Sequence, residues 1–224
     1  MRIEESIKIY GAKIDELLKD IIPPDRNDYL SEPIWHHMRT GGKRVRPALC
    51  LITCEALGGN HHEAINFALA IEAMHNMFLI HDDIEDGDTV RRDQPTVWVK
   101  YGTANAINAG DYLLACAYKT TLASPISLEK KIKLLQVLTS TYEKTVEGQA
   151  LDINARAAED FSVAKYMEMV ELKTGYYLAC GMVGGAIVSG ASEKVLEKIW
   201  MLGKTMGPAF QIRDDLIDLT HGKG

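Results

Sequence analysis

Two acidic clusters with the same spacing indicate a metal-dependent reaction. Each reads Asp-Asp-x-x-Asp within an apolar helical pattern, and the carboxylates are those of Asp82, Asp83, Asp86, Asp214, Asp215 and Asp218. The first and last residues of each cluster are four apart, so on a helix they share one face and their charges repel each other. One cluster alone would be an exposed acidic helix end more often than not. Two clusters with one ligand spacing favour helices that face each other across a metal-lined cavity.

The donor chemistry of these clusters favours magnesium. Carboxylate oxygens are hard ligands that suit Mg²⁺ or Ca²⁺ better than zinc. A calcium loop counted from Asp82 fails, because Ile84 cannot ligate at its third position and Asp93 replaces the glutamate at its twelfth. Magnesium uses few carboxylates and completes its shell with water and substrate phosphates. Arg91 and Arg92 follow at once and suit phosphate binding. We therefore expect several Mg²⁺ ions and a diphosphate between the clusters.

A second candidate anion site lies earlier in the chain. Residues 40–47 read Thr-Gly-Gly-Lys-Arg-Val-Arg-Pro, and we call them the basic loop. The paired glycines allow the backbone to approach a ligand closely, and Pro47 suits the first turn of a helix. Lys43 and Arg46 would then lie at a helix N-terminus, where anions bind well. The spacing excludes a Walker phosphate loop, and taken alone the segment is a basic turn about as often as a phosphate site.

Composition restricts the class of protein. The chain has 224 residues, of which 46% are hydrophobic and 25% charged, and this is typical of one globular domain. A formal net charge of −6 argues against a nucleic-acid binder. The four cysteines form no Cys-x-x-Cys pair and show no zinc spacing, so we expect buried, reduced thiols in a cytoplasmic protein. The sequence contains no apolar signal segment and no run of membrane-spanning length.

Helical periodicity predicts the elements that position these groups. Apolar spacing predicts helices over residues 3–20, 31–38, 47–57, 62–86, 104–122 and 127–149, then from Ser162 onward and from about Ser192 through Asp218. Ser127 is a candidate N-cap. Residues 87–96 are expected to form a loop. Because no segment shows convincing strand alternation, the predicted fold class is all-α.

The order and spacing of these motifs resemble those of the trans-isoprenyl diphosphate synthases, the polyprenyl synthetase family, and most of all its short-chain farnesyl and geranylgeranyl members. The resemblance covers residues 41–218. It implies a helical bundle around a deep central cavity and a homodimer. It also implies magnesium-dependent ionisation of an allylic diphosphate, followed by 1′-4 head-to-tail coupling to isopentenyl diphosphate and release of diphosphate. Residues 1–224 would form a single isoprenoid synthase domain without the family's C-terminal tail.

The resemblance also implies roles for individual residues. The six aspartates would hold magnesium on the allylic diphosphate. Isopentenyl diphosphate would be bound by Gly42, Lys43, Arg46, His75 and Arg92. The allylic substrate would be bound by the four residues expected to be catalytic, which are Arg91, Lys173, Thr174 and Gln211. Lys173, Thr174 and Gln211 would also stabilise the carbocation. Gln149 and Asp152 match a further polar pair on the cavity wall, and Lys223 matches the first of the family's later lysines. Asp93 departs from the family, which often has glycine there.

Three apolar residues are expected to limit the length of the product. Phe78 lies one helical turn before Asp82 on the same face, Met74 lies two turns before it, and a turn rises about 5.4 Å. Met77 lies beside Phe78. These side chains would form the floor of the cavity beneath the diphosphate, with core packing as the alternative role. In the family that the chain resembles, bulk at this place limits growth of the product, so one aromatic ring beside a methionine implies a short product, farnesyl or geranylgeranyl diphosphate (C15–C20).

Two other functions are compatible with the sequence. A class I terpene cyclase shares the first aspartate motif and the helical fold, although its second metal motif is normally of the Asn/Asp-Ser/Thr-Glu type. A non-catalytic partner subunit of a synthase would not need both aspartate clusters intact. The nature of the product, a diphosphate or a hydrocarbon, separates the first from a synthase, and magnesium-dependent release of diphosphate separates the second.

Overall fold

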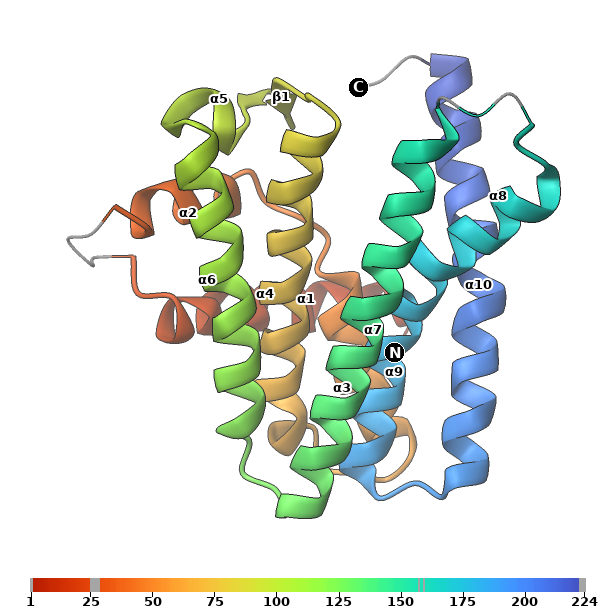
Figure 1. The fold of residues 1–224 in the computed structure, drawn as a ribbon. Coiled ribbons are helices and arrows are strands. Elements are labelled where there is room, and N and C mark those ends of the chain that lie inside the picture. The colour runs from red at the N-terminus through yellow and green to blue at the C-terminus, as the bar shows by residue number, and fades with distance from the viewer. Residues whose placement is uncertain (1, 25–28, 157, 159, 222–224) are drawn as a thin grey trace.

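The computed structural model describes residues 2–24, 29–156, 158 and 160–221, and these form the helical bundle that the sequence predicts. The helices are α1 (Ile3–Ile21), α2 (Ser31–Met38), α3 (Val45–Ala56), α4 (His61–Glu85), α5 (Val97–Tyr101), α6 (Thr103–Leu122), α7 (Leu128–Ala155), α8 (Val163–Val170), η1 (Glu171–Gly175), α9 (Tyr176–Ser189) and α10 (Glu193–His221) (Figure 1). The predicted all-α class is confirmed.

Helix α4 lies at the centre of the bundle because its sequence is apolar on every side. Its buried residues include Phe67, Ile71, Met74 and Ile80, and it contacts α3, α6 and α9. A helix without a polar face must be surrounded by other elements. Asn60 caps the helix by accepting a hydrogen bond from the His62 amide at 3.1 Å. The helix therefore holds the first aspartate cluster rigidly at its C-terminal end.

Close backbone contact between α3 and α9 fixes the end of the basic loop. A Cβ atom added to Gly181 would lie 2.5 Å from the Arg46 carbonyl oxygen, and one added to Gly185 would collide with the Cys50 carbonyl oxygen. Larger residues would force the two helices apart. The start of α3, which carries Arg46, is thus held directly against α9.

Three of the long helices end on the same side of the molecule. The C-terminal ends of α4, α7 and α10 all lie at the same end of the bundle (Figure 1). The segment 87–96, expected to be a loop without strands, instead contains a small antiparallel hairpin at this end. Its strands are β1 (Val90–Arg91) and β2 (Gln94–Pro95), with Val90 opposite Pro95 and Arg91 opposite Gln94. The hairpin was not predicted because two-residue strands are too short to show alternation.

Two further differences concern helices near the site. Helix α7 continues to Ala155, beyond the expected end at residue 149. The helix predicted from Ser162 does begin there, with the Ser162 hydroxyl accepting from the Lys165 amide at 3.2 Å, but η1 is a single π-helical turn. Such turns are rare and occur frequently at functional sites.

All four cysteines are buried and free, as expected. No described helix is both long and apolar enough to cross a bilayer.

Candidate active site

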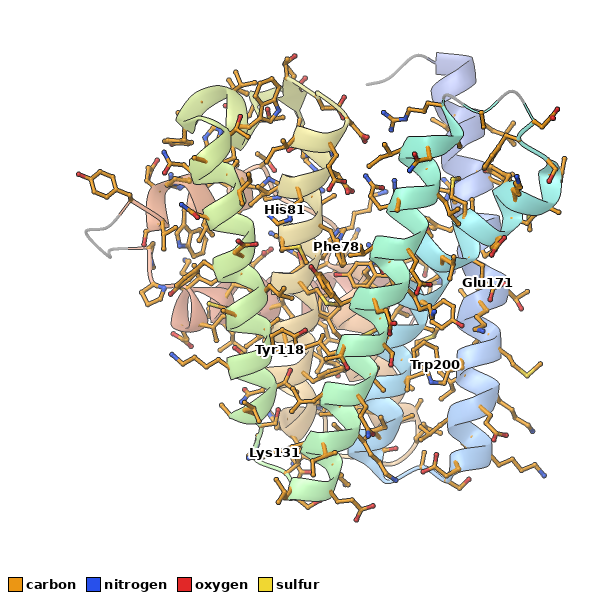
Figure 2. The ribbon with its side chains drawn as sticks, in the orientation of Figure 1. Phe78, His81, Tyr118, Lys131, Glu171 and Trp200 are labelled. Atoms are coloured by element: carbon orange, nitrogen blue, oxygen red, sulfur yellow. The ribbon has the colours of Figure 1, made fainter. Side chains whose placement is uncertain are left out.

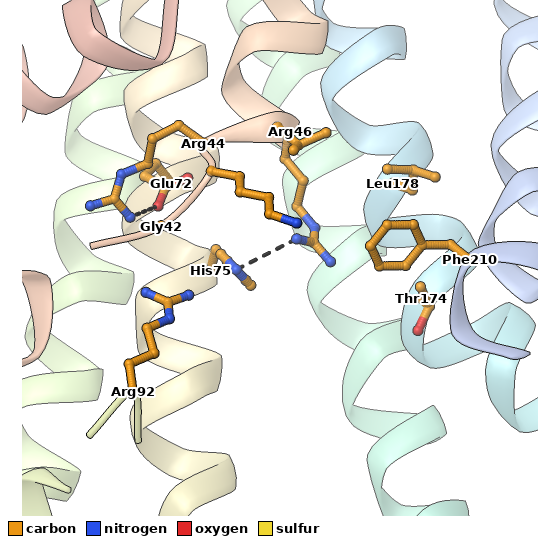
Figure 3. A pocket seen from close by; sticks show the side chains of 11 residues that line it. Gly42, Arg44, Arg46, Glu72, His75, Arg92, Thr174, Leu178 and Phe210 are labelled. Atoms are coloured by element: carbon orange, nitrogen blue, oxygen red, sulfur yellow. Dashed lines mark hydrogen bonds and ion pairs between the residues drawn. The ribbon is translucent and has the colours of Figure 1, made fainter. Parts of the chain in front are cut away.

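A cavity rich in cationic side chains lies between the basic loop, α4 and α10. We call it the cationic cavity, and its volume is about 430 Å³. The lining residues are Gly42, Lys43, Arg44, Val45, Arg46, Glu72, His75, Arg92, Thr174, Leu178 and Phe210. Phe210, Thr174 and Leu178 lie across the cavity from Arg92 and His75 (Figure 3). Four cations against one carboxylate leave an excess of three positive charges, which suits a diphosphate.

All five residues expected to bind isopentenyl diphosphate line this cavity. Arg46 Nη1 donates to His75 Nε2 at 3.5 Å, and its guanidinium lies 4.7 Å from the centre of the Tyr177 ring. Burial, reinforced by the neighbouring Arg46 charge, holds the pKa of His75 well below its usual value. His75 is therefore neutral at pH 7, so one ring nitrogen accepts from Arg46 while the other can donate to a phosphate oxygen.

The β1–β2 hairpin directs Arg92 toward the cavity. Arg92 and Asp93 occupy the turn with φ of 51° and 62°, the left-handed conformation of a type I′ hairpin turn. Glycine adopts this conformation more easily than aspartate or arginine, so both residues of the turn are strained. Arg92 Nη1 donates to Thr40 Oγ1 at 3.4 Å and so links the hairpin to the basic loop. Strained residues of this kind often serve binding.

The first aspartate cluster divides between two environments. Asp83 is 1% exposed and accepts a hydrogen bond from Arg91 Nε at 2.7 Å, so both residues are engaged with each other. Asp86 pairs with Arg156 Nη2 at 2.6 Å. Burial raises the pKa of Asp82 to about 7, with Lys173 opposing the rise and Glu85 and Asp86 adding to it. Asp82 and Asp86 thus lie on one helix face, as predicted, and Asp83 lies on another.

Helices α7, η1 and α10 bring the remaining polar groups to the opposite wall. Lys173 Nζ donates to Asp152 Oδ2 at 2.6 Å, and Thr174 Oγ1 donates to Gln211 Oε1 at 3.0 Å. Gln149 Nε2 donates to Glu85 Oε2 at 2.8 Å and so connects α7 to the end of α4. These pairs bring together the residues expected to be catalytic, except Arg91, which the Asp83 pair holds at the α4 side.

A glycine makes the position of η1 possible. A Cβ atom at Gly148 on α7 would collide with the backbone nitrogen of Lys173. The π-helical turn therefore packs directly on α7, and this contact aims Lys173 at Asp152. A second cavity of about 330 Å³ lies here, lined among others by Asp152, Arg156, Lys173, Thr174 and Gln211. Thr174 lines both cavities, so the two adjoin where one deep cavity was expected.

The three residues expected to form the floor are buried between α4 and its neighbours. Met74 and Met77 are almost fully buried, and Phe78 is 8% exposed. The Phe78 ring stacks on Tyr142 of α7 with centroids 5.6 Å apart and meets the edge of Tyr177 of α9 at 5.5 Å. Figure 2 shows Phe78 in the space between α4 and α7. Three aromatic rings thus close the interior one helical turn below Asp82.

Some predicted residues lie outside what the structure describes. These are the side chains of Asp214, Asp215 and Asp218, whose backbone belongs to α10, and the whole of Lys223. Within the described part of the chain, no three His, Cys, Asp or Glu side chains form a metal-binding group. Gln211 does lie in the site, and it precedes Asp214 by three residues, about one turn of the same helix.

Several contributors were not predicted. Tyr177 supports Arg46 and Phe78, and it lies one turn after Lys173, so the spacing of the helix could have indicated it. Phe210 directly precedes Gln211 and faces the cationic cavity. Arg156 pairs with Asp86 across 70 residues of sequence and belongs to no motif, so nothing in the sequence could have revealed it.

Comparison with known proteins agrees with this geometry. The family model described as polyprenyl synthetase matches residues 27–223. A geranylgeranyl diphosphate synthase of Methanosarcina mazei is 36% identical over 98% of this chain and 68% of its own length. A geranylfarnesyl diphosphate synthase of Aeropyrum pernix is 40% identical over 91% of this chain and 65% of its own.

The same likeness extends to solved structures. The crystal structure of a geranylgeranyl pyrophosphate synthetase from Pyrococcus horikoshii has a TM-score of 0.93 and 37% identity, covering 98% of this chain and 67% of that one. The chain thus spans about two thirds of the length of these relatives. It belongs to the polyprenyl synthetase family of prenyltransferase enzymes, and the resemblance found in its motifs is confirmed.

Proposed function

We propose that this chain condenses isopentenyl diphosphate with an allylic diphosphate to form a short-chain trans-prenyl diphosphate of C15–C20 and releases diphosphate. One observation carries the proposal above all others. The cationic cavity and the second cavity meet at Thr174, and the second cavity includes Arg156, which pairs with Asp86 at the C-terminal end of α4. Two anionic substrates can therefore be held side by side with their reacting carbons close together.

The cationic cavity would hold the diphosphate of the isopentenyl substrate. Lys43, Arg46 and Arg92 line it, and the neutral His75 adds a hydrogen-bond donor. The guanidinium groups can each make paired hydrogen bonds to phosphate oxygens. This arrangement would leave the double bond of the isopentenyl group directed toward Thr174.

The residues near Asp82 fit a divalent cation. Asp82 and Asp86 offer oxygen donors on one face of α4, and the raised pKa of Asp82 reflects burial and carboxylate neighbours that a cation would offset. When bound, Mg²⁺ would stabilise the negative charge that develops on the departing diphosphate. Asp214, Asp215 and Asp218 are proposed as ligands from the opposite side.

The remaining side chains would protect the allylic cation. Lys173 would share the leaving diphosphate, and the oxygens of Thr174 and Gln211 would lie toward the cationic carbon. The apolar wall of Met74, Met77 and Phe78 would exclude water that could otherwise quench the cation. The proton lost in the last step can pass to the departing diphosphate, so no separate protein base is needed.

The test is to incubate the purified chain with labelled isopentenyl diphosphate, Mg²⁺ and each short allylic diphosphate, and to measure diphosphate release and product by chromatography. The proposal predicts a prenyl diphosphate product. Asp82→Asn should lower kcat about a hundredfold or more, and Asp20→Asn, the same change at an exposed site on α1, should have no effect. A hydrocarbon product would instead indicate a terpene cyclase, and no turnover would refute both activities.

A further inference from the structure

Arg44 differs from the other cations of the basic loop in its backbone conformation. It has φ of 48° and ψ of 36°, the left-handed region that a residue with a Cβ rarely adopts. It immediately precedes α3 and lies between Lys43 and Arg46 in sequence. A residue other than glycine keeps this backbone conformation only where surrounding contacts hold it there.

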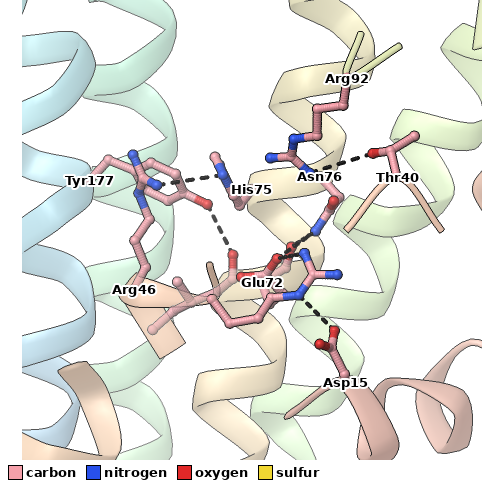
Figure 4. A network of polar contacts seen from close by, with 10 residues as sticks. Asp15, Thr40, Arg46, Glu72, His75, Asn76, Arg92 and Tyr177 are labelled. Atoms are coloured by element: carbon pink, nitrogen blue, oxygen red, sulfur yellow. Dashed lines mark hydrogen bonds and ion pairs between the residues drawn. The ribbon is translucent and has the colours of Figure 1, made fainter. Parts of the chain in front are cut away.

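Two carboxylates from different helices fix the Arg44 side chain. Arg44 Nη1 donates to Glu72 Oε1 of α4 at 2.6 Å, and Arg44 Nε donates to Asp15 Oδ1 of α1 at 2.7 Å. The Glu72 side chain is 2% exposed and also accepts from Asn76 Nδ2 at 2.9 Å (Figure 4). Gly11 of α1 also lies against this residue, and a Cβ there would contact Arg44 Cβ at 3.4 Å, an ordinary van der Waals distance. The guanidinium is therefore clamped between α1 and α4.

The neighbouring cations are free of such partners. Within the described part of the chain, no carboxylate lies within ion-pair distance of Lys43, Arg46 or Arg92. Their charges remain available to an anion, whereas the charge of Arg44 is matched by Glu72 and Asp15. One buried arginine thus holds the turn, and the residues before and after it face the cavity.

We infer that Arg44 is a positioning residue, clamped by Glu72 and Asp15, that holds Lys43 and Arg46 in register for the diphosphate of the isopentenyl substrate. The inference rests on the proposed function for the identity of that substrate. The clamp should affect one of the two substrates only, because the residues proposed to bind the allylic substrate, such as Lys173 and Gln211, are positioned by η1, α7 and α10.

The test compares variants that loosen the clamp in different ways. The double variant Arg44→Gln with Glu72→Gln replaces the buried ion pair by two neutral amides, so it leaves no unpaired buried charge. Asp15→Asn weakens the clamp at its half-exposed end. The double variant should raise the KM for isopentenyl diphosphate about tenfold or more, and Asp15→Asn should raise it less. The KM for the allylic substrate, and kcat at saturating isopentenyl diphosphate, should change less than about twofold.

A matched control and a binding measurement complete the test. Arg39→Gln removes an arginine from an exposed pair with Glu32 and should leave every constant unchanged. Calorimetric titration with inorganic pyrophosphate, without allylic substrate, should show the same loss of affinity as KM does. A correctly folded double variant that binds pyrophosphate as tightly as the wild type would overturn the inference. A wild-type chain that binds no pyrophosphate would overturn it as well. Wild-type chain that binds pyrophosphate but forms no product would refute the proposed function alone, and the titration would still decide the role of Arg44.

Discussion

Phe78 offers the sharpest test of how the interior sets product length. In Phe78→Ala the ring that stacks on Tyr142 and meets the edge of Tyr177 is lost. The next large side chain on that face of α4 is Met74, one turn deeper, so the floor should recede by about 5.4 Å. That distance is close to the length of one isoprenyl unit, and the main product should therefore grow by one unit.

The same substitution has a cost in stability that must be separated from its effect on the product. Removing a buried phenylalanine typically costs about 3–5 kcal/mol, so the assay should be run at a temperature where the variant is folded. Phe67→Ala is a matched control, because Phe67 is a buried ring on α4 that packs against Gly184, far from Asp82 along the helix. It should lose similar stability without changing the product.

The measurement is chromatography of the dephosphorylated products against standards of each chain length. A Phe78→Ala enzyme with an unchanged product distribution would refute the floor assignment. A Phe67→Ala enzyme with the same lengthening would show that loosening of the core, and not the position of Phe78, controls chain length.

Three further predictions follow from the packing and charge of the site. Gly148→Ala should destabilise the protein by about 1–3 kcal/mol in urea unfolding and lower kcat, because the new Cβ would displace the backbone of Lys173; unchanged values would contradict the packing of η1 on α7. Asp83→Asn should lower the free energy of unfolding by about 1–3 kcal/mol and reduce activity, because Arg91 loses its ion-pair partner. Normal activity of this variant would show that Asp83 does not position Arg91 for the reaction. Burial, followed by the charges of Arg91 and Arg92, lowers the pKa of His37 to about 3. The unfolded chain takes up that proton near pH 6.5, so the contribution of His37 to stability should be full above pH 6.5 and fall as the pH drops toward 3, by up to about 1.4 kcal/mol per pH unit. The pKa of the buried His75 is lowered as well, so the check is a difference between proteins: His37→Asn should reduce the slope of the unfolding free energy against pH, and a variant with the wild-type slope would contradict the prediction.

The elements that the sequence predicted well are those fixed by local pattern. The Ser162 hydroxyl begins its helix as expected, and the apolar run before Asp82 forms α4. The turn at Arg92 and Asp93 was not predicted, because it lacks the Asn-Gly or Asp-Gly signal of a type I′ turn. The π-helical turn at Lys173 and Thr174 was not predicted either, since it depends on the fit against Gly148 in another helix.

The candidate site shows the same division. Residues within motifs, such as Lys43, Arg46 and His75, were predicted and do line one cavity. The pairing among charged residues could not be predicted, because an ion pair such as Arg44–Glu72 or Asp86–Arg156 depends on tertiary packing rather than on spacing. Sequence therefore identified which groups carry charge, and the structure distinguished charges that are matched from those that are available.

The proposed reaction requires both aspartate clusters to bind one shared group of metal ions together with a diphosphate. The most direct test is an electron paramagnetic resonance titration with Mn²⁺ in the presence of inorganic pyrophosphate. Asp82→Asn and Asp214→Asn should each abolish most of the binding that depends on pyrophosphate, while Asp20→Asn on the exposed face of α1 should not. If the two variants instead lose separate and additive fractions of the bound Mn²⁺, or if binding does not depend on pyrophosphate, the two clusters do not share a diphosphate-binding metal site.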